Sequence, residues 1–352
     1  MIINKSIKNK VQEIIDTNAI NMNIADMLVA AFSYTDIINP DEVRQYIKEG
    51  YTEEEAILEI LFGFYGLEHN DENDDVLTRY VLNNLKKLCP LEYLNNPYVK
   101  NINVNEKLGK YKLKNISYEP YQLFAYDDIY LDEYKEYSRI GYFTSDFPYL
   151  ALAEGNNVWM SLNPNEIETM KPYISKGKGN VLVLGLGMGY VPYMMSLKDE
   201  VKSIVIVEKD HEIIELFKKA LLPLFAKKEK IKIIEDDAIN YLNKKEKDYD
   251  YIFADLWHNP EDGLSLFVQL KRINQNIDCW LEVSLYQMLR RCMITLLEEQ
   301  LANMGEENYK YARNYTDKVV NRFYQKTKNL HLNSEDDLHK LLSNESLLKL
   351  AI

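Results

Sequence analysis

Three glycines alternate with other residues where an apolar run, residues 181–184, comes to an end: Gly185, Gly187 and Gly189. Glycine lets the backbone turn sharply and lets a ligand approach closely. A helix that follows such a turn presents free N–H groups to that ligand. A dinucleotide site would need a small residue where Tyr190 stands, so the spacing disfavours NAD and favours another nucleotide-like ligand.

Acidic residues follow the next two apolar runs. Glu208 comes about 20 residues after the glycines, where a carboxylate can accept hydrogen bonds from both ribose hydroxyls of a nucleoside. Asp236, Asp237 and Ala238 follow the third run. A carboxylate there can accept a hydrogen bond from an adenine amino group, with Asp237 the better candidate and Asp236 the alternative. Glu208 as a solvated acid and Asp237 as a helix cap are the structural alternatives.

A fourth apolar run, residues 251–254, leads into Asp255, Trp257 and His258. Asp255 can face a cationic group or orient an incoming nucleophile. His258 is a candidate general base because imidazole titrates near neutral pH. Trp257 either stacks on a substrate or packs in the core. We therefore expect Asp255 and His258 to be the catalytic candidates.

These motifs need a scaffold that brings strand ends together. Continuous apolar runs that alternate with helices indicate a parallel sheet covered on both faces, and ligands bind beyond the carboxyl ends of its strands. The predicted strands are 181–184, 204–207, 231–234, 251–254 and 280–283.

The remainder of the chain predicts two further parts and a helical end. Residues 1–108 have mainly helical patterns, including a helix from about 74 to 88, and contain no chemical motif. Residues 109–176 predict short strands, with a hairpin turn at 154–157. The chain after residue 286 shows only helical signals. We predict three parts: a helical domain (1–108), a β-rich segment with a connecting helix (109–176), and the ligand-binding domain with a helical extension (177–352).

Composition excludes some functions. The net charge is −13, with 42 basic and 55 acidic residues and no basic block, which disfavours nucleic acid and anionic membranes as partners. No apolar run approaches the roughly 18–20 residues that span a bilayer. The three cysteines form no metal-ligand spacing and suit a reducing cytoplasm. We expect a cytoplasmic protein with a small-molecule substrate and no metal, for which a homo-oligomer is compatible.

The ordered series Gly185/Gly187/Gly189, Glu208, Asp237-Ala238 and Asp255 resembles the class I S-adenosylmethionine-dependent methyltransferases. The resemblance implies an α/β, Rossmann-like sheet that binds S-adenosylmethionine. It also implies that the glycines lie near the methionine part, Glu208 at the ribose and Asp237 at the adenine.

Within that superfamily, the strand-rich segment before the sheet and the tyrosine-aspartate entry to the fourth strand are similar to spermidine synthases. Those enzymes have consecutive glycines where this chain has an alternating series, and two acids bracketing serines where this chain has residues 255–260. We therefore expect methyl transfer to an unidentified small molecule. The alternatives are an aminopropyltransferase and a catalytically silent S-adenosylmethionine-binding protein.

Overall fold

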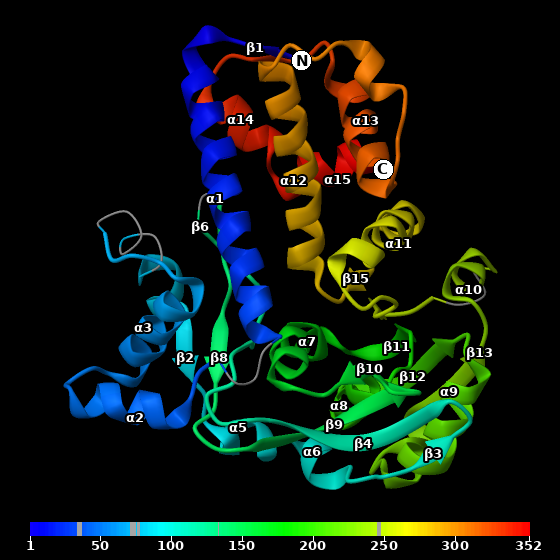
Figure 1. The fold of residues 1–352 in the computed structure, drawn as a ribbon. Helices are drawn as coiled ribbons and strands as arrows, with labels where there is room; N and C mark the ends of the chain where they lie inside the picture. Colours follow the sequence, from blue (N-terminus) through cyan, green and yellow to red (C-terminus); the bar gives the residue numbers. More distant parts are fainter. Residues whose placement is uncertain (34–36, 71–74, 76–77, 133, 245–247) are drawn as a thin grey trace. The chain divides into compact units, whose positions relative to one another are not determined.

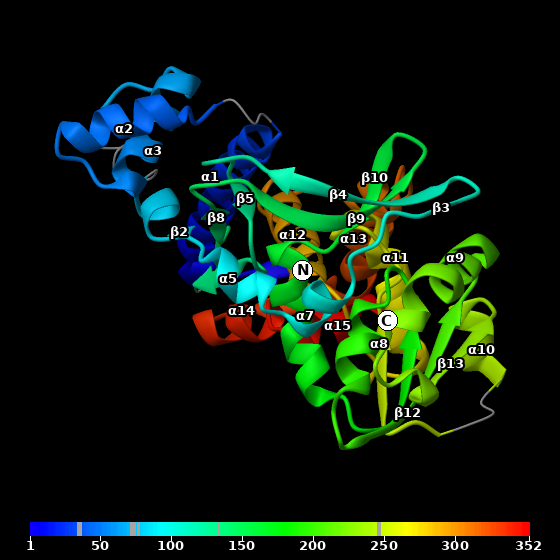
Figure 2. The same ribbon diagram turned by 90° about the horizontal axis from the view of Figure 1, so that it is seen from below.

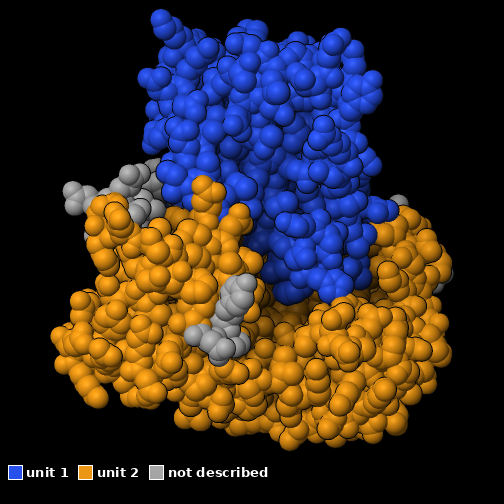
Figure 3. Space-filling view, viewed as in Figure 1, with its two compact units in different colours: residues 1–22, 132–135, 256–352 blue, residues 23–131, 136–255 orange. Residues whose placement is uncertain are grey.

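The computed structural model divides into two compact units (Figure 3). Unit 1 contains residues 1–22, 132–135 and 256–352, and unit 2 contains residues 23–131 and 136–255. Each unit is described by itself. The structure describes residues 1–33, 37–70, 75, 78–132, 134–244 and 248–352.

Unit 2 contains a parallel sheet whose strands are neighbours in the order β13-β12-β11-β14 (Figure 1). The first strand in sequence, β11, lies between the second and the fourth, which is the strand order of a Rossmann-like half. The strand interiors are apolar and almost fully buried. This confirms an α/β protein with a parallel sheet and four of the five predicted strands. The strands are β11 (Gly179–Leu184), β12 (Val201–Glu208), β13 (Ile231–Glu235) and β14 (Tyr251–Ala254).

Helices precede and follow these strands, so the carboxyl ends of all four strands meet at one edge. α7 begins after Asn163, whose side chain accepts a hydrogen bond from the N–H of Glu166. Asp210 caps the helix after β12 in the same way. The helices are α7 (Pro164–Lys176), α8 (Tyr190–Ser196), α9 (His211–Leu216) and α10 (Ala238–Lys244).

The prediction of a fifth strand at residues 280–283 is wrong. A two-residue strand, β15 (Asp278–Cys279), comes earlier, and α12 (Glu282–Leu301) begins where the strand was expected. The buried Lys271 explains the change, because its ammonium group donates to Glu282 at 2.8 Å and to the carbonyl of Ile277 at 2.8 Å. This ion pair fixes the first turn of α12, which an apolar pattern cannot reveal.

An antiparallel sheet in unit 2 has the order β10-β9-β4-β3, and its two long strands β4 (Tyr111–Tyr118) and β9 (Phe147–Glu154) lie side by side (Figure 2). β9 and β10 (Asn157–Ser161) form the predicted hairpin, with Glu154 opposite Asn157. Gly155 in the turn has a φ of 61°, which glycine adopts without strain. The predicted β-rich segment is thus present as a sheet; the remaining strand is β3 (Lys107–Leu108).

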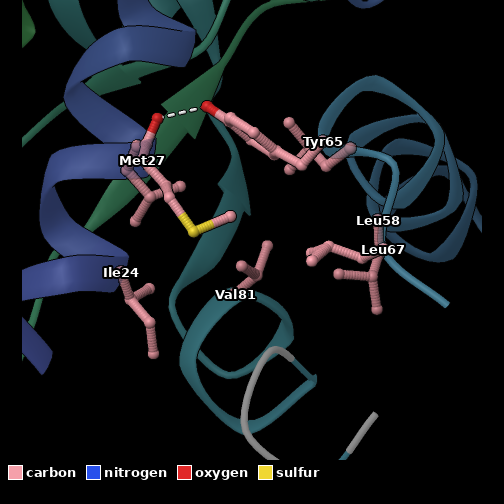
Figure 4. Close-up of a pocket in the computed structure, with 8 residues that line it drawn as sticks. Ile24, Met27, Leu58, Tyr65, Leu67 and Val81 are labelled. Carbon is pink, nitrogen blue, oxygen red and sulfur yellow. Dashed lines mark hydrogen bonds between the residues drawn. The ribbon is translucent and has the colours of Figure 1, made fainter. Parts of the chain in front are cut away.

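The helices α2 (Pro40–Lys48) and α3 (Glu53–Tyr65) begin at the expected caps, and Thr52 with Glu55 forms a capping box. A cluster of buried apolar residues joins α3 to the second half of α1 (Lys8–Phe32). Figure 4 shows a small apolar cavity in this cluster, where the Tyr65 hydroxyl donates to the carbonyl of Met27. N-terminal helices are therefore present, packed through an apolar core.

The prediction of one helix from about 74 to 88 is wrong in its second half. Residues 71–74 and 76–77 lie outside the described residues; a helical turn covers Thr78–Leu82. β2 (Leu85–Lys87) follows and pairs in parallel with β8 (Ile140–Tyr142), which also pairs with β5 (Phe124–Ala125). Hydrogen bonds to a strand more than 50 positions away in sequence outweigh the local helical pattern.

Unit 1 is mainly helical. α12 packs against α11 (Pro260–Ile273), α13 (Tyr315–Thr327) and α15 (Asn344–Ala351), and its core includes Leu289. β1 (Ile2–Ile3) pairs in parallel with β16 (His331–Leu332), a strand that the helical signals did not predict. No described helix has the length and apolarity needed to cross a membrane. The remaining elements are α5 (Pro90–Leu94), α6 (Pro97–Asn101), β6 (Tyr130–Asp132), β7 (Lys135–Tyr137) and α14 (Glu335–Leu341).

Candidate functional site

The glycine loop (residues 185–189) joins β11 to α8. Gly185, Gly187 and Gly189 all have positive φ angles, of 95°, 50° and 77°. Residues with a side chain rarely adopt these angles, so the alternating glycines are required by the path of the backbone. The Gly189 N–H donates to the carbonyl of Leu186 at 2.8 Å, which closes the loop into a tight turn.

Packing inside the protein explains one of these glycines further. A Cβ atom on Gly189 would lie 2.3 Å from the ring of Phe217, and one on Gly187 would lie 3.1 Å from the sulfur of Met160. The first approach is a clash with a buried ring, whereas a methionine side chain can move. Gly189 therefore serves packing as well as backbone conformation, and Gly187 leaves its side of the loop narrow but adaptable.

Glu208 ends β12 and holds the glycine loop. Its Oε2 accepts a hydrogen bond from the N–H of Leu186 at 3.0 Å. Its Oε1 accepts hydrogen bonds from the N–H groups of Lys209 and Asp210, both at 2.8 Å. A carboxylate offers about four acceptor positions, so three N–H donors leave capacity for a further donor such as a ribose hydroxyl.

The two acids after β13 differ in their partners. Asp237 caps α10, because its Oδ1 accepts from the N–H groups of Ile239 and Asn240, each at 3.0 Å. Asp236 forms an ion pair with Lys244, and that contact lowers its pKa. Ala238, the first residue of α10, is buried. The cap leaves Oδ2 of Asp237 with no acceptor role recorded among the described residues, so the adenine role of Asp237 stays a prediction.

Asp255 follows β14 and lines a cavity of about 20 Å³ together with the glycine loop. Its N–H donates to the carbonyl of Leu184 at 2.8 Å, which places it directly beside the loop. Burial, and to a smaller extent the charge of Glu208, raises the pKa of Asp255 to about 7. A carboxyl group in this state exchanges protons near neutral pH, as a general acid or base requires.

Glu166, in the first turn of α7, lines the same cavity, and the sequence analysis did not identify it as a site residue. Its pKa lies well above the usual range because of burial and the charge of Asp255. The Asn163–Glu166 spacing was interpreted only as a helix start. The structure shows the Asn163 half of that cap without a reciprocal bond from the Glu166 side chain. The missing reciprocal bond leaves Glu166 available to the cavity.

His258 belongs to unit 1, whereas Asp255 ends unit 2. The His258 side chain is exposed, and its Nδ1 lies 3.0 Å from Asp262 Oδ2. Asp262 also accepts the N–H groups of His258 and Asn259, which fixes the start of α11. Trp257 is buried against Gly263 in the same turn, so it packs. The catalytic role of His258 stays a prediction.

The residues at the sheet edge fit a nucleoside. No acceptor is recorded among the described residues for the N–H groups of Gly187 and Met188, so the loop has donors available to a ligand. Carboxylate acceptors follow β12, β13 and β14 in order. The cavity beside Asp255 takes only a water-sized group of atoms, so the larger part of a nucleoside would lie outside it.

Residues 167–327 match the sequence model of the spermine/spermidine synthase domain. This part of the chain is a spermine/spermidine synthase domain. It begins one residue after Glu166 and ends with the last residue of α13, and it includes every site residue predicted from the sequence. The resemblance to that subgroup of the class I fold is therefore confirmed.

Solved structures that match the chain include two of interest beside the spermine/spermidine synthase domain. A putative O-methyltransferase from Klebsiella pneumoniae has 16% identity and a TM-score of 0.24, and the match covers 29% of this chain and 46% of that chain. Spermidine synthase from Thermotoga maritima has 18% identity and a TM-score of 0.25, with 34% and 45% covered. This chain spans less than half the length of each. No curated protein matches the sequence.

Proposed function

We propose that this protein transfers an aminopropyl group from decarboxylated S-adenosylmethionine to a small amine. The observation that carries the proposal is the pair of carboxyl groups, Glu166 and Asp255, that line one cavity with the glycine loop. The family of residues 167–327 supports it, because spermine and spermidine are amines. The three-part division at residues 108 and 176 is kept as part of the proposal.

Charge favours this donor over S-adenosylmethionine itself. Both carboxyl groups have raised pKa values, so each binds a proton in the absence of a neighbouring cation. An ammonium group would lower both pKa values and gain favourable charge interactions, whereas the carboxylate of a methionine tail would be repelled. The cavity therefore selects for a cationic ligand.

The residues of the chain have separate roles in the proposal. The glycine loop and Glu208 hold the nucleoside, and Asp237 or Asp236 binds its adenine. The bound donor supplies an electrophilic carbon on a sulfonium; attack by the amine nitrogen forms the N–C bond, breaks the C–S bond and releases one proton. Asp255, with its pKa of about 7, can accept a proton from the amine near neutral pH. Alignment supplies the larger part of the rate enhancement.

Calorimetry at pH 7 tests the donor. We expect decarboxylated S-adenosylmethionine to bind more tightly than S-adenosylmethionine, and NAD not to bind. Repeating the titration in buffers of different ionisation enthalpy should show proton release on binding of the decarboxylated donor. Glu166→Gln should reduce both the selectivity and the proton release, whereas Glu200→Gln, which changes an exposed acid before β12, should change neither.

Mass spectrometry with short diamines as acceptors then tests transfer. A product heavier by one aminopropyl group supports the proposal. Tighter binding of S-adenosylmethionine, with no effect of Glu166→Gln, would contradict it. Binding without transfer to any amine would support the catalytically silent alternative.

Methyl transfer is the second candidate. The observation that favours it is the alternating series of glycines, which differs from the consecutive glycines of the spermidine synthases that the chain resembles. In that case S-adenosylmethionine should be the tighter ligand, and the product should gain one methyl group.

A further inference from the structure

The short helix α6 is fastened to the region of the glycine loop by three side-chain hydrogen bonds. Asn96 Nδ2 donates to the hydroxyl of Tyr190 at 2.9 Å, and Asn101 Nδ2 donates to the hydroxyl of Tyr193 at 2.7 Å. Between them, the Tyr98 hydroxyl donates to the carbonyl of Met188. Only this third bond reaches the backbone of the glycine loop.

Tyr98 lies fully inside unit 2. Its side chain is 0% exposed, and its ring meets those of Tyr190 and Tyr193 edge to face, with centroids 5.6 Å and 5.2 Å apart. A phenylalanine would fill the same space. A buried hydroxyl is costly unless it is hydrogen-bonded, so the Met188 carbonyl is the partner that makes tyrosine acceptable here.

The bond fixes one peptide group of the loop. The carbonyl of Met188 and the N–H of Gly189 belong to the same planar peptide group and point in opposite directions. Tyr98 holds the carbonyl, and the carbonyl of Leu186 accepts the Gly189 N–H at 2.8 Å. With both ends held, the peptide group cannot rotate, and the preceding N–H groups of Gly187 and Met188 keep their directions.

We propose that Tyr98 is a positioning residue for the nucleoside: it holds the glycine loop in the orientation that presents the N–H groups of Gly187 and Met188 to the ligand. The inference rests on the proposed function for the identity of the ligand. It concerns a residue outside the matched domain, in a segment to which no chemical role was given from the sequence.

Tyr98→Phe tests the proposal, because it removes the hydroxyl and keeps the ring. Amide hydrogen exchange of a peptide covering residues 185–190 should accelerate in the unliganded variant. The Kd for S-adenosylhomocysteine, used as the probe, should rise roughly two- to tenfold, the range expected for one hydrogen bond. Tyr142→Phe is the matched control, since Tyr142 is equally buried but donates to Glu54; exchange and affinity should not change.

A second pair of variants keeps the test decisive if Tyr98→Phe does not fold. Asn96→Ala removes the cap that accepts the N–H of Tyr98 at 2.9 Å, so loop exchange should also accelerate. Asn101→Ala removes only the bond to Tyr193, and loop exchange should stay as in the wild type. Unchanged exchange in both Tyr98→Phe and Asn96→Ala would overturn the proposal. Failure of the wild type to bind any sulfur nucleoside would instead overturn the proposed function, because the exchange experiment needs no ligand.

Discussion

Glu208 accepts a hydrogen bond from the N–H of Leu186 at 3.0 Å, which ties the end of β12 to the glycine loop after β11. The predicted ribose ligand therefore also has an anchoring role in the protein. Its carboxylate reaches the loop because β11 and β12 are parallel neighbours, with Leu184 opposite Val207. Binding of a nucleoside and the shape of the loop depend on the same side chain.

Glu208→Ala should affect both stability and binding. Hydrogen bonds to a charged group contribute about 1.5–3 kcal/mol each, so the free energy of unfolding should fall by at least about 1.5 kcal/mol and nucleoside affinity by roughly tenfold or more. Urea denaturation and calorimetry measure the two effects. Glu215→Ala, which removes an exposed acid paired with Lys218, should change neither by a comparable amount. Unchanged affinity in Glu208→Ala would return Glu208 to a purely structural role.

Asp255 should make stability depend on pH. Because its pKa in the folded protein is raised to about 7, the folded state keeps a proton that the unfolded chain releases near pH 4. The folded state then binds more protons, so this group's contribution to the free energy of unfolding falls as pH rises from about 4 to about 7. Asp255→Asn should flatten that fall, measured as the Tm at several pH values. Parallel curves for variant and wild type would contradict the raised pKa.

Gly189→Ala should be more destabilising than a glycine substitution in open space. Gly189 and Gly155 both have positive φ angles, so alanine costs about 1–2 kcal/mol at either position. Only at Gly189 does the new Cβ meet Phe217, at 2.3 Å, and such overpacking costs about a further 1–3 kcal/mol. Urea denaturation of the two variants measures the difference. Equal losses of stability would mean that the loop and the Phe217 ring adjust without cost.

His258→Ala should keep the fold and reduce turnover less than Asp255→Asn does. The His258 ring is exposed and paired with Asp262 at the start of α11, and substitutions at such positions change stability by within about 0.5 kcal/mol. Initial rates over a pH series, with a transferring substrate in hand, compare the two variants. A severe loss of turnover together with loss of the pH dependence near neutrality would assign the base to His258.

Local patterns in the sequence determined the strands and most helix starts. Runs of buried apolar residues such as 181–184 leave few alternatives to a covered parallel strand, and caps such as Thr52 with Glu55 act through neighbouring backbone groups. For the same reason the positions of Gly185, Glu208 and Asp255 at consecutive strand ends were readable: the connection between strand end and ligand edge is a property of the sheet. Lys271 and β2 lay beyond this reach, because their partners are fixed by contacts that local periodicity does not encode.

The sequence by itself thus determined a parallel α/β sheet and an ordered set of candidate ligands along its edge. Tertiary structure alone decided which further side chains join them. Glu166 lines the cavity of Asp255 from a helix that precedes the sheet, and Tyr98 bonds to Met188 across 90 positions. Neither contact has a sequence period, because distant segments meet through packing. A buried polar group takes whichever partner the folded chain brings within hydrogen-bond distance, so its role is set only when the chain is folded.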